Sequence, residues 1–189
     1  PTRSGGCRPV GDSHLPAWLH FVYASILSFY AYHFLEWALH SLGHNKKWGG
    51  EMYRIHIAHH HKYCQGSLLQ DGPYEGKGGE KAFMPWVFSF WVIAYVAFEN
   101  RTSIVFIVES CLLLIASNYM HEAFHIKDNW LEQNMFTRNW FLCRRERHFL
   151  HHYKPKINMS LGGIHSVADQ ILGTHMEVPS GALSKERLC

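Results

Sequence analysis

Charged side chains are scarce in this sequence of 189 residues. Asp, Glu, Lys and Arg make up 17% of the chain, whereas an average soluble domain has about 25%. The formal net charge of +3 at pH 7 is too small to indicate a nucleic-acid partner. The five cysteines are scattered and form no Cys-x-x-Cys pair, which argues against a disulfide framework and against a cysteine-based zinc finger.

Aromatic residues, in contrast, reach 15% of the chain, a content that excludes a disordered polypeptide. The length argues for a single domain. We expect this domain to span residues 14–176, between a polar tail at 1–13, rich in Gly and Pro, and a C-terminal tail at 177–189. The chain begins with Pro1 rather than Met, so we expect a processed form or a fragment.

Three long apolar segments, 15–39, 82–98 and 102–120, predict helices that cross a membrane. The stretch 83–98 contains no charged residue and shows no polar face at helical spacing, unlike a surface helix of a soluble domain. A spanning helix needs about 20 residues. We therefore predict an all-α integral membrane bundle of about three spanning helices. The alternative is a soluble all-α protein with buried core helices.

Lys and Arg are distributed unevenly around these segments. If all three segments cross, nearly all of the 18 Lys and Arg residues fall on one side, in 40–81 and 121–189. The three exceptions are Arg3, Arg8 and Arg101. Because cytoplasmic segments carry the excess of positive charge, we expect this side to be cytoplasmic, at a bacterial inner membrane or the endoplasmic reticulum.

Histidine is the most unusual component, with 16 residues. Ten of them fall into four clusters that alternate His-x-x-x-His with His-x-x-His-His. The clusters are His40 and His44; His56, His59 and His60; His121 and His125; His148, His151 and His152. Residues three and four positions apart share one face of a helix, so the imidazoles of each cluster point in one direction. Ligands of the same metal ion must be arranged in this way. A His-x-x-His-His triple is expected by chance roughly 0.1 times in such a chain, and it occurs twice.

Ten imidazoles exceed the capacity of one metal ion. A structural zinc takes four ligands, so we predict two metal ions with about five nitrogens each. The order pair, triple, pair, triple indicates a two-fold arrangement with five histidines in each half. The other six histidines are expected to serve packing or surface roles: His14, His20, His33, His61, His165 and His175. On a helix, His61 lies about 140° around from His56, away from the ligand face.

The order of the clusters resembles the membrane fatty acid hydroxylase superfamily, which contains sterol desaturases and is related to carotenoid hydroxylases. The resemblance covers about residues 33–176. Glu36, four residues before His40, is similar to the Glu-x-x-x-His pattern that begins the family's first cluster. Its C-terminal signature is similar to the stretch His148–Lys154 followed by Asn158, Gly162 and Asp169-x-x-x-Gly173-Thr174.

The resemblance implies a di-iron centre, in which zinc can replace iron, within a cytosolic helical cap on the membrane bundle. It also implies dioxygen-dependent hydroxylation or desaturation of a lipid C–H bond, most of all in a fatty-acyl lipid. Electrons are expected from a separate donor of ferredoxin or cytochrome–reductase type. No catalytic residue beyond the metal ligands is expected; Glu36, Asn158 and Asp169 are candidates for supporting the imidazoles.

Two other functions stay open: a carotenoid or sterol hydroxylase or desaturase of the same superfamily, and a His-rich membrane metal transporter or sensor. A transporter places its ligands near the membrane midplane, whereas the four clusters lie at or beyond the ends of the apolar segments, which favours the enzyme. Next to His148, the basic run of Arg144, Arg145 and Arg147 is interpreted as a solvated helix face, with a lipid-phosphate or donor-binding site as the alternative.

Overall fold

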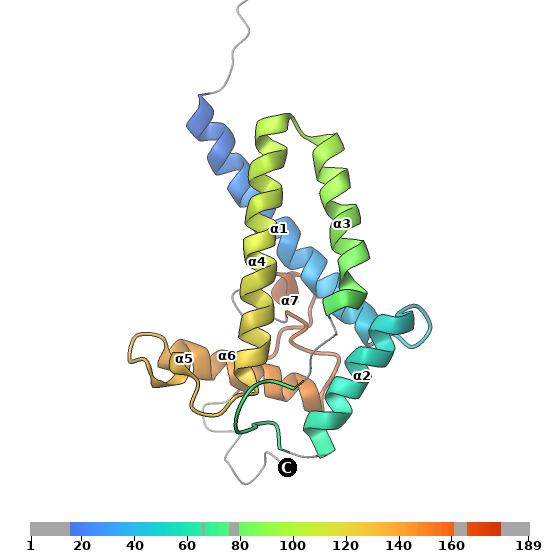
Figure 1. Ribbon diagram of the computed structural model, residues 1–189, viewed down its shortest axis with the longest axis vertical. Helices are drawn as coiled ribbons and strands as arrows, with labels where there is room; N and C mark the ends of the chain where they lie inside the picture. The colour runs from blue at the N-terminus through green and yellow to red at the C-terminus, as the bar shows by residue number, and fades with distance from the viewer. Residues whose placement is uncertain (1–15, 66, 76–79, 161–165, 179–189) are drawn as a thin grey trace, which may run out of the picture.

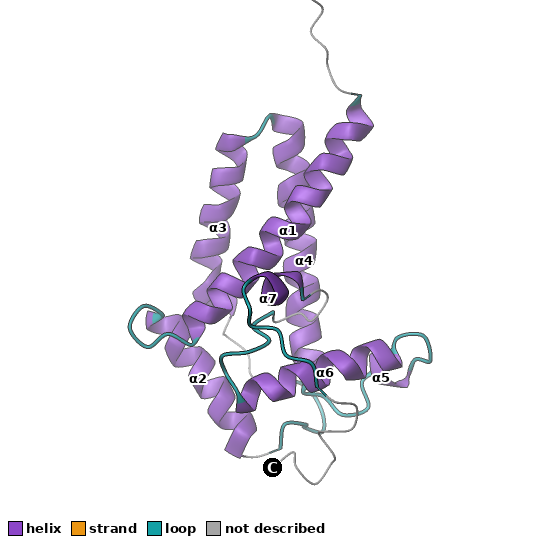
Figure 2. Cartoon of the chain, turned by 180° about the vertical axis from the view of Figure 1, so that it is seen from behind, coloured by secondary structure: helices purple, strands orange, loops and turns teal. Residues whose placement is uncertain are grey.

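The computed structural model describes residues 16–65, 67–75, 80–160 and 166–178. Within these ranges the chain is all-helical (Figure 2), apart from one isolated bridge between Gln70 and Ile126. The helices are α1 (Ala17–Gly43), α2 (Gly50–Gln65), α3 (Glu80–Ala97), α4 (Asn100–Phe124), α5 (Trp130–Gln133), α6 (Arg138–Tyr153) and α7 (Val167–Ile171). The predicted tail at 1–13, most of the tail at 177–189, His14 and His165 lie outside the described residues.

Three long helices form an upright bundle, and the shorter helices gather at its lower end (Figure 1). Helices α3 and α4 stand side by side, joined by a short turn, and α1 crosses them at an angle. Helices α2 and α6 lie across the lower end of the bundle, and α7 packs on α1. The arrangement is a bundle of long helices with the shorter helices gathered at one end.

Small residues allow α1 and α4 to pack closely. Ala24 and Ser28 on α1 are fully buried, as is Ser103 on α4. The Ser28 hydroxyl donates a hydrogen bond to the backbone oxygen of Phe106, 3.1 Å away. Small side chains with hydroxyl groups are typical of helix pairs that pack in a membrane, where backbones must approach each other and polar groups must find partners.

The outer surface of the bundle is strongly apolar. Among the described helices, α4 is long and apolar enough to cross a membrane, and α3 carries a shorter apolar stretch, Lys81–Ala97. Only 28% of the apolar window of α4 is buried within the protein, whereas the core helix of a soluble domain is mostly buried. Large apolar side chains at least half exposed include Phe21, Ile26, Phe88, Ile93, Val96, Ile104, Leu112 and Ile115.

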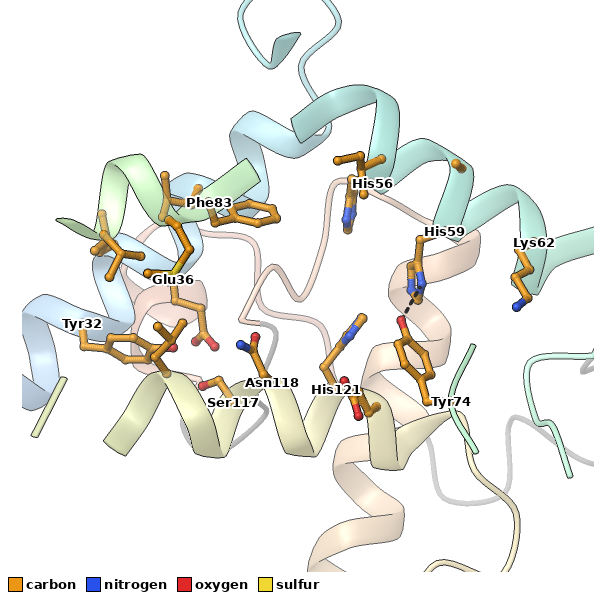
Figure 3. A pocket seen from close by; sticks show the side chains of 18 of the residues that line it. Tyr32, Glu36, His56, His59, Lys62, Tyr74, Phe83, Ser117, Asn118 and His121 are labelled. Atoms are coloured by element: carbon orange, nitrogen blue, oxygen red, sulfur yellow. Dashed lines mark hydrogen bonds between the residues drawn. The ribbon is translucent and has the colours of Figure 1, made fainter. Parts of the chain in front are cut away.

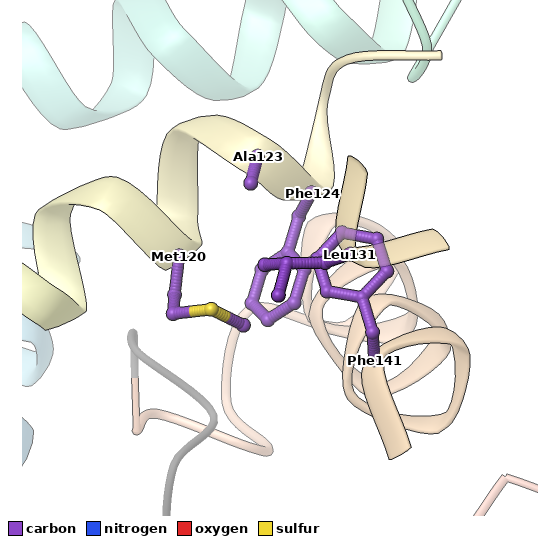
Figure 4. Close-up of a cluster of buried hydrophobic side chains, with 5 residues drawn as sticks. All are labelled: Met120, Ala123, Phe124, Leu131 and Phe141. Atoms are coloured by element: carbon purple, nitrogen blue, oxygen red, sulfur yellow. The ribbon is translucent and has the colours of Figure 1, made fainter. Parts of the chain in front are cut away.

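A buried cluster attaches α5 and α6 to the end of α4 (Figure 4). It consists of Met120, Ala123 and Phe124 from α4, Leu131 from α5 and Phe141 from α6.

Arg145 reinforces this junction. Its guanidinium group donates to the Glu132 carboxylate at 2.7 Å and to the backbone oxygen of Ile126 at 2.9 Å. The expectation that Arg145 belongs to a solvated helix face is therefore wrong: the residue is only 4% exposed, because α6 turns it toward the last turn of α4 and α5.

Candidate metal centre

The motif histidines meet where α2 and α6 lie against the ends of α1 and α4. The first pair lies at the end of α1, the first triple on α2, the second pair at the end of α4 and the second triple on α6. Two groups form, in each of which all ligand nitrogens lie within 4.8 Å of one another. Histidine group 1 contains His40, His44, His56, His60 and His151. Histidine group 2 contains His59, His125, His148 and His152.

The Nε2 atoms of histidine group 1 are crowded together. His56 Nε2 lies 2.9 Å from that of His40, 2.8 Å from that of His44 and 3.1 Å from that of His60. His151 Nε2 lies 3.0 Å from His44 Nε2. Gly43 makes room for this group, because a Cβ atom at residue 43 would meet the His56 ring at 3.3 Å.

Histidine group 2 has the same spacing. His148 Nε2 lies 3.0 Å from the Nε2 atoms of both His125 and His152. His121 lies beside this group, its ring centroid 4.7 Å from that of His59 and 4.8 Å from that of His148, but it is outside the tight set. The Nε2 atoms of His59 and His121 are buried and have no hydrogen-bond partner among the described residues.

These distances fit the ligand sphere of a metal ion. Two nitrogens about 2.1 Å from one ion lie about 3.0 Å apart when their bonds are at right angles, and about 3.4 Å apart in a tetrahedron. The observed 2.8–3.1 Å between neighbouring Nε2 atoms matches the first value. The spacing is therefore compatible with a metal ion shared by the imidazoles of each group.

The two groups do not follow the two halves of the chain. His59, the middle histidine of the first triple, joins the second pair and the second triple. Conversely, His151, the middle histidine of the second triple, joins the first pair and the first triple. Each half thus gives one ligand to the other group, an exchange that the expectation of five histidines per half does not include.

Backbone carbonyl groups fix the orientation of three imidazoles. His40 Nδ1 donates to Met159 O, His151 Nδ1 to Ile157 O at 2.7 Å, and His125 Nδ1 to Leu68 O at 2.9 Å. A proton held on Nδ1 leaves the Nε2 lone pair free for a metal.

Tyr74 contacts a fourth imidazole through its hydroxyl group. Its hydroxyl lies 3.1 Å from His59 Nδ1. Tyr74 and the carbonyl groups could not be predicted from the sequence, because backbone acceptors and loop residues leave no signal in a histidine pattern.

The predicted supporting residues Asn158 and Asp169 organise the segment that provides two of these carbonyls. The Asp169 carboxylate accepts hydrogen bonds from the backbone N–H groups of Met159 and Ser160 and from the Thr174 hydroxyl, at 2.7, 3.1 and 2.7 Å. Asn158 adopts a positive φ of 50°, a conformation that Asn tolerates better than most residues, and its Oδ1 accepts from Met176 N.

Replacing Asp169 by Asn is expected to weaken metal binding in histidine group 1 by roughly 10- to 100-fold. Asn has one acceptor oxygen where the carboxylate has two, so the segment that holds His40 and His151 loosens. Histidine group 2 should keep its affinity, because Leu68 and Tyr74 orient its rings. Chelator competition measures both sites, and Asp71→Asn, at an exposed carboxylate, is the control. Equal weakening of both sites would contradict this role.

Glu36, the third predicted supporting residue, lies elsewhere. Its carboxylate is buried and lies 3.3 Å from Nδ1 of His33. The described contacts thus place Glu36 beside a histidine of the apolar helix. Of the other non-motif histidines, His20 pairs with Glu99 at 3.2 Å, and His61 is exposed, as the helical angle predicts.

The electrostatic surroundings favour neutral imidazole, the form that binds metals. Burial lowers the pKa of His44 to about 4. Burial and the neighbouring His151 lower the pKa of His60 to about 2, and burial and His44 lower that of His151 to about 3. Burial and the surrounding histidines also hold the pKa values of His148 and His152 well below their usual range.

A cavity of about 350 Å³ leads to the histidines from between α1, α2, α3 and α4 (Figure 3). Its apolar lining comprises Leu35, Leu39, Phe83, Met84, Val87 and Leu114. Tyr32, Glu36, Ser117 and Asn118 add polar groups at the end where Phe83 lies. His56, His59 and His121 line its inner part. Beyond them lie Lys62 and Glu75, which form an ion pair at 2.9 Å. The cavity therefore connects an apolar space among the bundle helices with both histidine groups.

Comparison with models of protein families, with curated proteins and with solved structures finds no match to this chain. The assignment of function therefore depends on the geometry of the centre itself.

Proposed function

We propose that this chain is a membrane-bound di-iron oxygenase of the fatty acid hydroxylase superfamily. It hydroxylates or desaturates a lipid at a C–H bond, with dioxygen and with electrons from a separate donor. The substrate we favour is a fatty-acyl lipid. The observation that carries the proposal is the combination of two adjacent histidine groups with an apolar cavity that reaches them.

In this proposal α1, α3 and α4 cross the membrane, and the shorter helices at the end of the bundle form a cap that faces the cytoplasm. The exposed apolar side chains of the bundle support the crossing. The concentration of Lys and Arg in 40–81 and 121–189 supports the orientation. The histidine groups then lie at the cytoplasmic end of the bundle, where a lipid can reach them from the bilayer and a soluble donor from the other side.

Histidine groups 1 and 2 would each hold one iron ion. Imidazole binds iron, copper and zinc, but zinc has no redox chemistry. Bound iron supplies the oxidising power that an unactivated C–H bond requires. The five nitrogens of histidine group 1 and the four of histidine group 2 would be enough to hold one ion each.

The chain's own residues position the substrate. Leu39, Val87 and Leu114 line the part of the cavity among the bundle helices, where they bind an acyl chain by burying its methylene groups, each worth about 0.8 kcal/mol. The same walls exclude water from the histidines. His56, His59 and His121 then face the segment of the chain that reaches the inner part of the cavity.

Lipid analysis of a host that expresses the protein tests the proposal. Cells with the wild-type chain should accumulate a lipid that has gained one oxygen or lost two hydrogens. Cells with His151→Ala should lack it, whereas His61→Ala should retain it. An unchanged lipid profile together with increased cellular metal would overturn the oxygenase and favour a metal transporter.

A further inference from the structure

Helix α6 carries two cations that the metal centre does not use, Arg144 and Arg147. Both are partly buried, and among the described residues neither has an acidic partner within 4.0 Å. Their neighbour Arg145, in contrast, is paired with Glu132 at 2.7 Å. Partly buried guanidinium groups without a counter-charge are costly, so this pair requires an explanation.

The two arginines line a small pocket of about 20 Å³. The other lining residues are Phe124, His148, Asn158, Ser160, Ser166 and Asp169. Three of the lining side chains have a buried polar atom without a hydrogen-bond partner in the described part of the chain: Arg147 Nε, Asn158 Nδ2 and Ser160 Oγ. Asn158 is itself only 6% exposed. Two of these atoms are obligate donors, and the hydroxyl can donate as well.

The lining has an excess of positive charge and of hydrogen-bond donors. Burial and the adjacent charge of Arg147 lower the pKa of Arg144, which indicates that the two cations repel each other. Asp169 is the one carboxylate in the lining, and it already accepts three hydrogen bonds, from Met159 N, Ser160 N and the Thr174 hydroxyl. A ligand that supplies acceptors and negative charge would satisfy the unpartnered donors.

We propose that this pocket binds a phosphate group, either of an anionic phospholipid or of free phosphate. A volume of about 20 Å³ admits one water-sized oxygen atom, which Asn158 and Ser160 can hold. The guanidinium groups of Arg144 and Arg147 bind the other phosphate oxygens, because guanidinium groups bind phosphate through paired, charge-assisted hydrogen bonds. The lipid source depends on the proposed membrane location, whereas the free-phosphate source does not.

Apolar residues near the pocket suit a lipid. Trp140 precedes Arg144 by one helical turn and is 38% exposed, and Ile171 and Leu172, which closely follow Asp169, are 66% and 44% exposed. Aromatic and basic residues together are typical of the level of the lipid headgroups.

Binding to the full chain in a maltoside detergent, which contains no phosphate, tests the site. Inorganic phosphate is titrated against chloride at equal ionic strength, and phosphatidic acid against phosphatidylcholine, with thermal stability and phosphorus NMR as readouts. Stabilisation by both phosphate and phosphatidic acid supports a site for the free ion. Stabilisation by phosphatidic acid alone supports a lipid site. No stabilisation by either ligand overturns the proposal.

Substitutions of the lining residues test whether phosphate binds in this pocket. Arg144→Gln with Arg147→Gln should weaken binding by roughly tenfold or more, and Ser160→Ala should weaken it less. The control is Arg138→Gln, an exposed residue of the same helix that does not line the pocket. Binding that is equal in the double variant and the wild type overturns the site. Because neither readout requires turnover, these results are independent of whether the oxygenase proposal holds.

Discussion

His59→Ala and His60→Ala, changes at adjacent residues of α2, are expected to weaken different metal sites. His59 belongs to histidine group 2 and His60 to histidine group 1. Loss of one imidazole removes one of the five nitrogens of histidine group 1 or one of the four of histidine group 2. Each single variant should therefore keep one metal ion under chelator competition where the wild type keeps two, and both should lose lipid oxidation.

Double variants distinguish the two sites by metal content alone. His44→Ala with His60→Ala removes two ligands of the same group, so one ion per chain should remain. His59→Ala with His60→Ala removes one ligand from each group, so both sites should be depleted. His61→Ala, at an exposed histidine, should keep two ions. If the His59 and His60 double variant retained one ion, the exchange of ligands between the halves would be refuted.

Leu114→Trp is expected to abolish oxidation of the lipid and to leave the metal content unchanged. Leu114 lines the apolar part of the cavity, and a larger side chain there occupies the space for the acyl chain. A well-packed site has little room for added volume. The loss of product should be at least about tenfold, since it removes the burial of two or more methylene groups, each worth about 0.8 kcal/mol.

The next residue of α4 provides the matched control. Ile115 is 65% exposed on the outer surface of the bundle, so Ile115→Trp should retain both activity and metal. Product analysis measures the lipid oxidation by the two purified variants, and elemental analysis measures their metal content. Equal activity of Leu114→Trp and Ile115→Trp would show that the substrate does not pass through this cavity.

The long helices could be predicted from the sequence because uncharged, apolar runs define them. The segments 82–98 and 102–120 correspond to α3 and to most of α4. The segment 15–39 corresponds to α1, which continues to Gly43. The added turns at the ends of α1 and α4 carry His40 and His121. An apolar run ends where the first polar ligand appears, but the helix does not.

The convergence of the histidines was also predictable, since spacing by three and four residues places them on one helical face. The exchange of His59 and His151 was not. Adjacent histidines such as His59 and His60 are about 100° apart around a helix, so they can point to two different sites, and the crossing of α2 with α6 decides which. Crossing angles depend on packing between distant segments, which a single sequence does not contain.

The two histidine groups also tie distant parts of the chain together. His44 and His151, which share histidine group 1, are 107 residues apart, so a metal bound by both acts as a cross-link that closes a very long loop. Histidine group 2 likewise requires His148 and His152 of α6. Because synthesis proceeds from the N-terminus, neither site can be completed until α6 has left the ribosome. A chain that stops earlier carries most of the motif histidines without a complete site, so in the proposed di-metal protein metal loading would separate chains that include α6 from chains that do not.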